Sequence, residues 1–398
     1  MKIRTLVGGL LAVGATQATA ADWSFDPRVG AAYVYNDNHR LTDVEGTEID
    51  VSGASLDAQL AMRAATQRSL FLLTPRLRST FFPSDESEEA DDQFVRMFAR
   101  HATERTLTSL DVDYSRVVTL GYYFPEANVT SDDVLGDPDR GVGLGQSGRN
   151  RQDRLVLTPR FAFDVAERQR LHFQVEYLDV TYDEQVPGDR VDFENVLFAA
   201  GYRYALTETS AIMLQGGYAT YDPADGNSTE VQGLNAEWRN VLSDTAEIYV
   251  RAGANRVESI SNSGKSSWDT GFSGGTGVRW TFEVSDVWLD ASTSLDPDSS
   301  GDIVTRDQVR LQFTRRLGPM TRLTLAGRVM KDTGAGDAEA TFDDRTYATG
   351  NVGLEWRFAK QWSVSGSYNY QWREYDEADT DAESNAFIIG IAWEPNRR

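Results

Sequence analysis

The chain has 398 residues, a formal net charge of −22 at pH 7 and no cysteine. The missing cysteine excludes disulfides, thiol chemistry and cysteine-ligated metal sites, and so acidic a chain is not expected to bind nucleic acid. No run of 18 or more apolar residues follows residue 20, so the sequence offers no transmembrane helix.

The first twenty residues have the pattern of a secretory signal peptide. Lys2 and Arg4 precede an apolar stretch, and Ala18 and Ala20 occupy the small-residue positions of a cleavage site. We therefore expect residues 1–20 to be a signal peptide and residues 21–398 to form one domain outside the cytoplasm.

From residue 21 onward one unit recurs, a segment of alternating apolar and polar residues followed by a connector. A period of two is typical of a strand with one wet and one apolar face. We count eighteen such segments, starting near residues 24, 50, 70, 93, 107, 152, 170, 191, 210, 230, 246, 267, 286, 303, 321, 345, 361 and 384.

The connectors alternate between short turns and longer acidic loops. The short ones include 65–69, 101–105 and 206–210, whereas 85–92 and 376–384 are rich in Asp and Glu. This alternation predicts an all-β fold, a transmembrane antiparallel up-and-down β-barrel of about 18 strands, with 16 as the alternative. Its short turns and both termini would be periplasmic and its long acidic loops extracellular, in a bacterial outer membrane. A soluble sandwich or propeller would need irregular crossovers or a blade motif, and neither is visible.

Parity within each strand separates a lipid face from a lumen face. In residues 70–82, for example, Leu73, Leu77 and Phe81 fall on one face and Arg76 and Arg78 on the other. Because a barrel in hydrocarbon must keep its apolar face outward, the charged face is expected to line the interior. The predicted basic lining is Arg76, Arg78, Arg96, Arg100, Arg154, Arg160, Arg203, Arg239, Arg251, Arg279, Arg310, Arg328, Arg357 and Arg373. The predicted acidic lining is Asp57, Asp111, Asp113, Asp164, Glu176, Glu237, Asp290 and Glu355.

The arginines outnumber the acids on this wall although the whole chain is acidic. Guanidinium groups bind carboxylate, sulfate and phosphate through a planar donor fork, so a wall of them favours anionic solutes. The prediction is a pore with an arginine-rich lumen, favouring an anionic polysaccharide, with a general or small-anion porin as the alternative. A second alternative is a closed structural or adhesive barrel plugged by the 123–150 loop, and arginines that merely pair with neighbouring acids would fit either alternative.

Enzymatic activity is not expected. The chain has three histidines, and no G-x-S-x-G or H-E-x-x-H motif accompanies them. No cofactor is predicted, although the acidic loops 85–92 and 376–384 could hold Ca²⁺ through several carboxylates.

Two motifs stand near the ends of the mature chain. The opening motif is Tyr33, Tyr35, Asp37 and Asn38, and the closing hairpin carries Gly353, Leu354, Trp356, Arg357, Trp362, Ser363, Val364, Ser367 and Tyr368. At these residues the chain resembles the β-barrel porin type of outer-membrane protein associated with exopolysaccharide assembly and export. The resemblance implies a role in polymer secretion. The partners expected from it and from the barrel are outer-membrane lipid and lipopolysaccharide, a polysaccharide and periplasmic export components.

Overall fold

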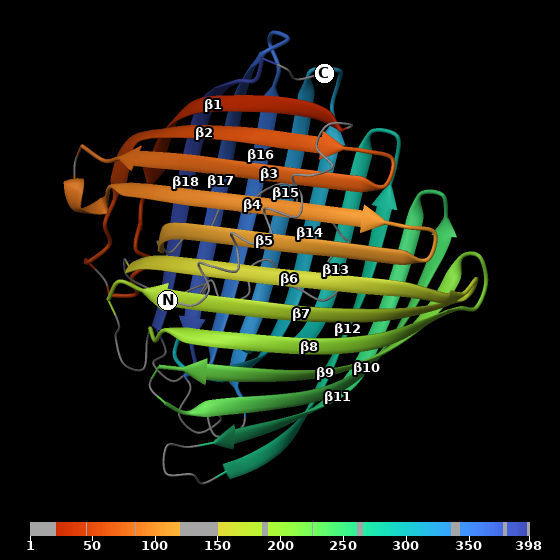
Figure 1. The fold of residues 1–398 in the computed structure, drawn as a ribbon. Coiled ribbons are helices and arrows are strands. Elements are labelled where there is room, and N and C mark those ends of the chain that lie inside the picture. The colour runs from red at the N-terminus through yellow and green to blue at the C-terminus, as the bar shows by residue number, and fades with distance from the viewer. Residues whose placement is uncertain are drawn as a thin grey trace.

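The computed structural model is a single antiparallel sheet of eighteen strands (Figure 1). It describes residues 21–395 except 45, 84, 120–149, 185–189, 225, 261–265, 336–342 and 377–379. The predicted signal peptide therefore lies outside the described residues, as does the 123–150 loop apart from Asn150.

The strands, in chain order, have the following bounds: β1 Asp22–Asn36, β2 Val51–Ala65, β3 Ser69–Phe81, β4 Ala90–Ala102, β5 Thr106–Thr119, β6 Asn150–Ala166, β7 Gln169–Tyr182, β8 Phe193–Ala205, β9 Ser210–Pro223, β10 Ser228–Ser243, β11 Ala246–Ile260, β12 Ser266–Thr281, β13 Ser285–Pro297, β14 Ile303–Arg316, β15 Thr321–Gly334, β16 Arg345–Trp356, β17 Trp362–Tyr375 and β18 Thr380–Trp393. One short 3₁₀ helix, η2 (Glu86–Glu88), lies between β3 and β4. In the described part of the chain, no helix is long and apolar enough to cross a membrane.

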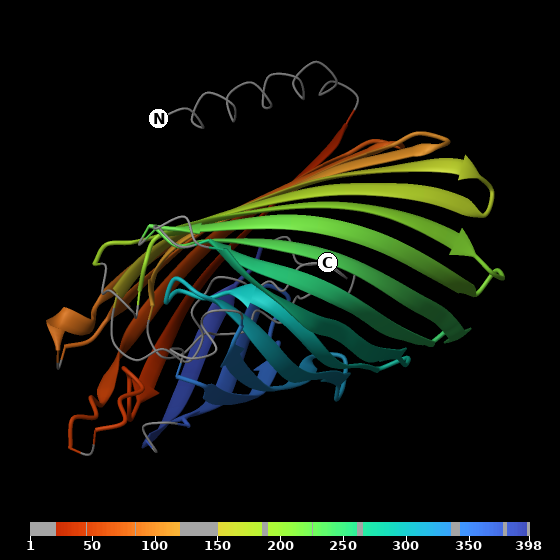
Figure 2. The ribbon, with the colours of Figure 1, turned by 90° about the horizontal axis from the view of Figure 1, so that it is seen from below.

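Every strand pairs with its neighbour in sequence, and β1 pairs with β18, so the sheet closes on itself. Seen from below, the wall formed by the early strands faces the wall formed by the later ones across the interior (Figure 2). The prediction of a closed up-and-down barrel of about eighteen strands is confirmed, and each predicted strand start lies within four residues of the observed one.

The outside of the barrel is apolar, as the period of two predicts. In the β16–β17 hairpin the exposed side chains include Val352, Leu354, Trp356 and Trp362. Elsewhere the outward positions include Leu77, Leu234 and Ile389, which are 60 %, 66 % and 64 % exposed. A closed sheet satisfies its own backbone hydrogen bonds, so this surface can face hydrocarbon without an unpaired edge.

One rim carries short turns with a repeated sequence device, and we call it the short-turn rim. Thr66, Thr103 and Thr207 each accept a hydrogen bond through Oγ1 from the backbone N–H three residues later, at 2.9, 3.0 and 3.0 Å. A hydroxyl that bonds its own turn favours a tight reversal, which is why T-x-x-S and T-x-x-T recur there.

The opposite rim carries the acidic connectors, and we call it the long-loop rim. Some of these connectors are shorter than the sequence suggests, because the strands continue into them. The β9–β10 connector is 224–227 and the β13–β14 connector is 298–302.

Residues from the motif near the N-terminus fasten β1 to β18 where the barrel closes. Asp37 accepts hydrogen bonds from the backbone N–H and side-chain amide of Asn385, at 2.7 and 2.8 Å. Asn38 donates to the carbonyl of Glu383 at 3.0 Å, and Ser384 donates to Asn36 at 2.9 Å. Asp37 and Asn38 of this motif therefore stabilise the pairing of β1 with β18 that closes the barrel.

Candidate functional site

The interior wall of the barrel carries most of the charged strand residues. The predicted lining residues lie on the strands β2 (Asp57), β3, β4, β5 (Asp111, Asp113), β6, β7 (Glu176), β8 (Arg203), β10, β11 (Arg251), β12 (Arg279), β13 (Asp290), β14, β15, β16 and β17, apart from Arg357, which directly follows β16. The ladder registers place Asp57 opposite Arg78, Arg96 opposite Asp113 and Glu237 opposite Arg251. Residues directly opposite in a ladder share one face of the sheet, so the predicted groups are adjacent in the fold.

One ladder of arginines and aspartates runs from β2 to β4. Arg76 Nε donates to Asp57 at 2.6 Å, and Arg78 donates twice to Asp92, at 3.0 and 2.7 Å. Both guanidinium groups also lie over the ring of Phe94, 5.3 and 5.5 Å from its centroid. Asp92 was absent from the predicted lining, because it was assigned to the acidic loop 85–92.

The same ladder continues from β4 to β6. Asp113 lies between Arg96 and Arg154, each at 3.2 Å. Arg160 lies 3.6 Å from Asp111 and donates to Gln174 at 3.2 Å. One carboxylate here serves two guanidinium groups, and the Arg96 side chain is 52 % exposed.

Three more of the predicted acids have arginine or tyrosine neighbours. Asp164 accepts two hydrogen bonds from Arg170, at 2.5 and 2.9 Å, and Glu237 lies 3.3 Å from Arg239. Asp290 lies 3.0 Å from Arg310 and also accepts from the hydroxyl of Tyr249.

Other predicted arginines differ in their surroundings. Arg279 lies 3.5 Å from Asp286, Arg328 donates to Gln308 at 2.8 Å, and Arg373 is buried against Tyr375, with its guanidinium 4.7 Å from the ring centroid. Arg100 and Arg203 form no ion pair with any described residue. The wall is therefore a mixture of paired and available guanidinium groups.

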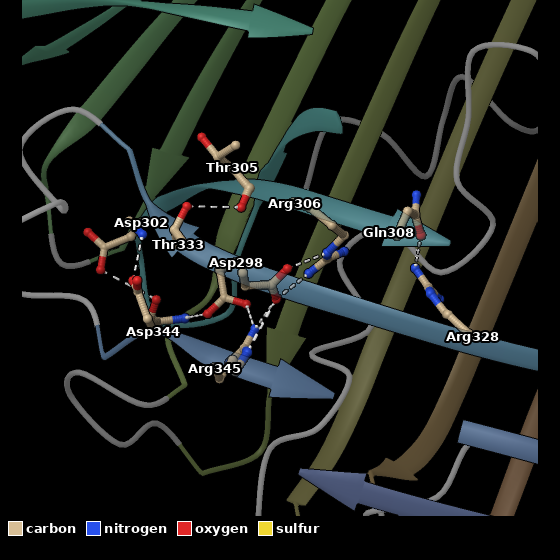
Figure 3. Close-up of polar contacts among 12 residues, drawn as sticks. Asp298, Asp302, Thr305, Arg306, Gln308, Arg328, Thr333, Asp344 and Arg345 are labelled. Atoms are coloured by element: carbon tan, nitrogen blue, oxygen red, sulfur yellow. Dashed lines mark hydrogen bonds and ion pairs between the residues drawn. The ribbon is translucent and has the colours of Figure 1, made fainter. Parts of the chain in front are cut away.

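Four deeply buried charged residues form a network that the sequence analysis missed (Figure 3). Asp332 on β15 accepts from Arg306 on β14, at 2.7 and 2.9 Å, and from Arg345 on β16, at 3.2 and 3.0 Å. Arg345 also donates to Asp298 in the β13–β14 connector. All four side chains are at most 4 % exposed. Arg306, Asp332 and Arg345 lie at or near strand ends, and Asp298 lies in a connector. At such positions the alternation of apolar and polar residues does not predict which way a side chain points.

Asp298 belongs to a connector that crosses the interior. The hydroxyl of Tyr221 on β9 donates to the Asp298 carbonyl at 2.8 Å, and the backbone N–H of Val191 donates to Ser299 at 2.8 Å. The partners Tyr221 and Arg345 are on opposite walls, so the 298–302 segment is held from both sides. We call this segment and its bonds to β9 and β16 the cross-wall tie.

An apolar cluster supports the cross-wall tie. Leu178, Val180 and Tyr182 of β7 pack with Phe193, Tyr221 and Ile303, and all six are at most 6 % exposed. The first five belong to the β7–β9 wall and Ile303 follows the connector, so burial fixes the segment across the interior.

Several carboxylates of the acidic loop 85–92 have protein donors. Asp85 caps η2 through Ser87, Glu88 is bonded by Arg40, and Asp91 accepts from Ser79. Among the described residues, no group of three or more His, Asp or Glu is arranged to hold a metal ion. Calcium binding at 85–92 or 376–384 stays a prediction, and three residues of the second loop lie outside the described part.

In the described part of the chain, neither His39 nor His101 belongs to a Ser-His-carboxylate triad. His39 is buried 3.7 Å from Glu88. His101 Nδ1 lies 2.9 Å from the Ser69 hydroxyl near the short-turn rim, and no described carboxylate contacts that imidazole.

No known family and no curated protein matches this sequence. Solved structures with a similar course of the chain include the outer membrane channel DcaP of Acinetobacter baumannii, with 12 % identity and a TM-score of 0.43 over 94 % of this chain and 97 % of that one. OccK2 (OpdF) of Pseudomonas aeruginosa has 11 % identity and a TM-score of 0.46 over 94 % and 98 %. A BenF-like porin from Pseudomonas fluorescens has 10 % identity and a TM-score of 0.47 over 94 % and 99 %. At these identities and TM-scores the comparisons assign neither a family nor a substrate to this chain.

Proposed function

We propose that the chain is an integral protein of a bacterial outer membrane and forms a channel for small anionic solutes. The closed sheet with its apolar outer surface supports the membrane location, because an apolar surface of this extent is stable in lipid and not in water. The N-terminal signal-peptide pattern supports export from the cytoplasm, and the short turns would then lie in the periplasm with both termini.

The arginine-rich ladder of β3–β6 is the observation that carries the anion preference. An arginine has five N–H donors, more than a single carboxylate can accept. Asp113 lies between two arginines, and Arg96 remains half exposed. A solute carboxylate or sulfate could therefore bind successive guanidinium groups along the wall, which raises its local concentration.

The cross-wall tie favours small solutes over wide polymers. It lies between β9 and β16 and reduces the space available in the long-loop half of the interior. A channel narrowed by protein selects by size as well as charge.

Passage of an anionic exopolysaccharide is the second candidate. An aromatic ring next to an arginine favours it, since the ring centroid of Trp288 lies 4.9 Å from the Arg310 guanidinium. Such a pair could stack on a sugar ring while the arginine binds its carboxylate. The resemblance at the chain ends to porin-type proteins of exopolysaccharide export points the same way.

The test is ion selectivity in planar bilayers under a salt gradient. The parent protein should favour anions. Replacing Arg76, Arg78, Arg96 and Arg100 together with Gln should move the reversal potential toward that of an unselective pore. The control is R256Q/K331Q, which removes two cations from the outward parity of β11 and β15. A selectivity unchanged in the fourfold variant, or lost equally in the control, would refute the proposed role of the ladder.

The same bilayers separate the two cargo classes. Short oligomers of a uronic acid should block the current more strongly than neutral glucose oligomers of the same length if the interior binds anionic saccharides. If both oligomers block the current equally, the result favours small anions as the cargo. A parent protein without measurable conductance would instead favour a closed structural barrel.

A further inference from the structure

In the described part of the chain, the wall of the barrel is incomplete at the seam between β12 and β13. The ladder between β12 and β13 runs from Thr281 and Asp286 only as far as Gly274 and Thr293. Beyond that point β12 continues to Ser266 against β11, and β13 continues to Pro297 against β14. Four residues of β13 and the facing residues of β12 thus lie at the same level without pairing to one another.

The two strands diverge because their ends have opposite environments. Asp296 at the end of β13 and Asp298 just beyond it are 5 % and 2 % exposed, whereas residues 266–270 of β12 are exposed at both parities. Leu295 would face outward by parity, yet it packs against the interior cluster of Tyr221 and Ile303. The cross-wall tie therefore draws the β13–β14 hairpin inward, away from β12.

The height of this opening is close to the outer surface of a membrane. Thr293 lies eight residues above Ser285, the first residue of β13. At about 3.3 Å per residue and a tilt of about 40°, the ladder ends roughly 20 Å above the short-turn rim, and the apolar band of such barrels is about 25 Å tall. The opening thus begins where acyl chains meet headgroups.

The side chains around the opening differ between its two faces. On the outward parity of β12, Trp268 and Phe272 are 67 % and 62 % exposed, the kind of aromatic residue that sits at a lipid interface. The interior parity carries the small or polar residues Asp269, Gly271 and Ser273. Gly271 has open space where a side chain would be.

We propose that the β12–β13 seam is a lateral opening through which a lipid-like amphiphile passes between the barrel interior and the outer leaflet. The polar side chains of the interior face suit a headgroup, and the exposed aromatic residues outside suit an acyl chain. This inference rests on the proposed membrane location but goes beyond passage of small anions, because an amphiphile would leave through the wall and not along the axis.

The geometry is tested by cysteine pairs, which the cysteine-free chain makes specific. Continuing the ladder register would set Phe272 opposite Leu295. The F272C/L295C variant should not form a disulfide under mild oxidation, whereas T276C/A291C, a directly opposed pair of the intact ladder, should form one readily. Equal cross-linking of both pairs would show a closed seam and overturn the inference.

The route is tested with a phospholipid that carries a maleimide on its headgroup, in vesicles that contain the protein. S273C, on the interior parity beside the opening, should react with this lipid. T349C, on the interior parity of β16 and paired on both sides with β15 and β17, should not. A small water-soluble maleimide should label both. Labelling of neither or of both by the lipid, with the soluble reagent reacting normally, would overturn the opening.

Two further outcomes are informative. If the soluble maleimide labels neither variant, the interior is closed to water and the proposed channel itself fails. If the single variant F272C forms a disulfide-linked dimer, a second copy covers the edge of β12, and the amphiphile route is excluded.

Discussion

The buried network around Asp332 gives the sharpest prediction about stability. Asp332 is fully buried and accepts four hydrogen bonds from two arginines that are themselves buried. Replacing it with Asn keeps the shape but removes the charge that both arginines bind, while Asp298 still accepts a hydrogen bond from Arg345. Breaking a buried ion pair costs about 3–5 kcal/mol, which lowers the ratio of folded to unfolded protein roughly 150- to 5,000-fold.

The neighbouring residue supplies the control. Lys331 forms an ion pair of 2.7 Å with Asp376, and both side chains are about two-fifths exposed, 44 % and 40 %. Because solvent screens such a pair, D376N should unfold at the same urea concentration as the parent. The assay is urea unfolding in lipid vesicles, followed by tryptophan fluorescence and by heat-dependent gel mobility. If D332N and D376N unfold at the same urea concentration, the network does not stabilise the barrel and the reasoning is wrong.

Three other substitutions test close packing, parity and the cross-wall tie. G53A should lower the free energy of unfolding by about 1–3 kcal/mol, because the added Cβ would lie 1.9 Å from a backbone carbonyl oxygen of β3. G366A, which has open space around the added Cβ, should be as stable as the parent. Equal urea midpoints for the two variants would refute this prediction. I389R, on the lipid face, should cost about 2–4 kcal/mol in vesicle refolding, and I388R, on the interior face, much less; the reverse order would place the lipid on the wrong side. D298A should raise the single-channel current, because the segment loses its bond to a buried arginine, and an unchanged current would show that this segment does not narrow the channel.

Strand positions could be predicted from sequence because a single rule determines them. Alternation of apolar and polar residues persists wherever one face of a strand belongs to the apolar outer surface, and Leu234, Trp356 and Ile389 follow it. The rule weakens toward the long-loop rim, where β18 begins at Thr380, four residues before its predicted start near 384. The first residues of β18 include Asp381 and Glu383, and this acidic stretch was predicted to be part of a loop.

The candidate site was predictable only in part. The adjacency of Arg76 with Asp57 and of Arg96 with Asp113 follows from parity and neighbouring strands. The cross-wall tie does not, because it joins Tyr221 to a backbone carbonyl 77 residues away. The period of two predicts the strands and which strands are neighbours. It does not predict the position of the 298–302 segment, because that position depends on contacts between residues far apart in the sequence.

Closure of β1 on β18 has a consequence for biogenesis. The strand that pairs with the edge of β1 is β18, which is translated after every other strand. The hydrogen bonds between Asp37 and Asn385 can form only then. A nascent or shortened polypeptide therefore carries two open strand edges, the form most prone to aggregate. With the proposed membrane location, the chain has to stay unfolded until insertion, and a chaperone or protease that recognises an unpaired strand edge would detect any copy that lacks β18.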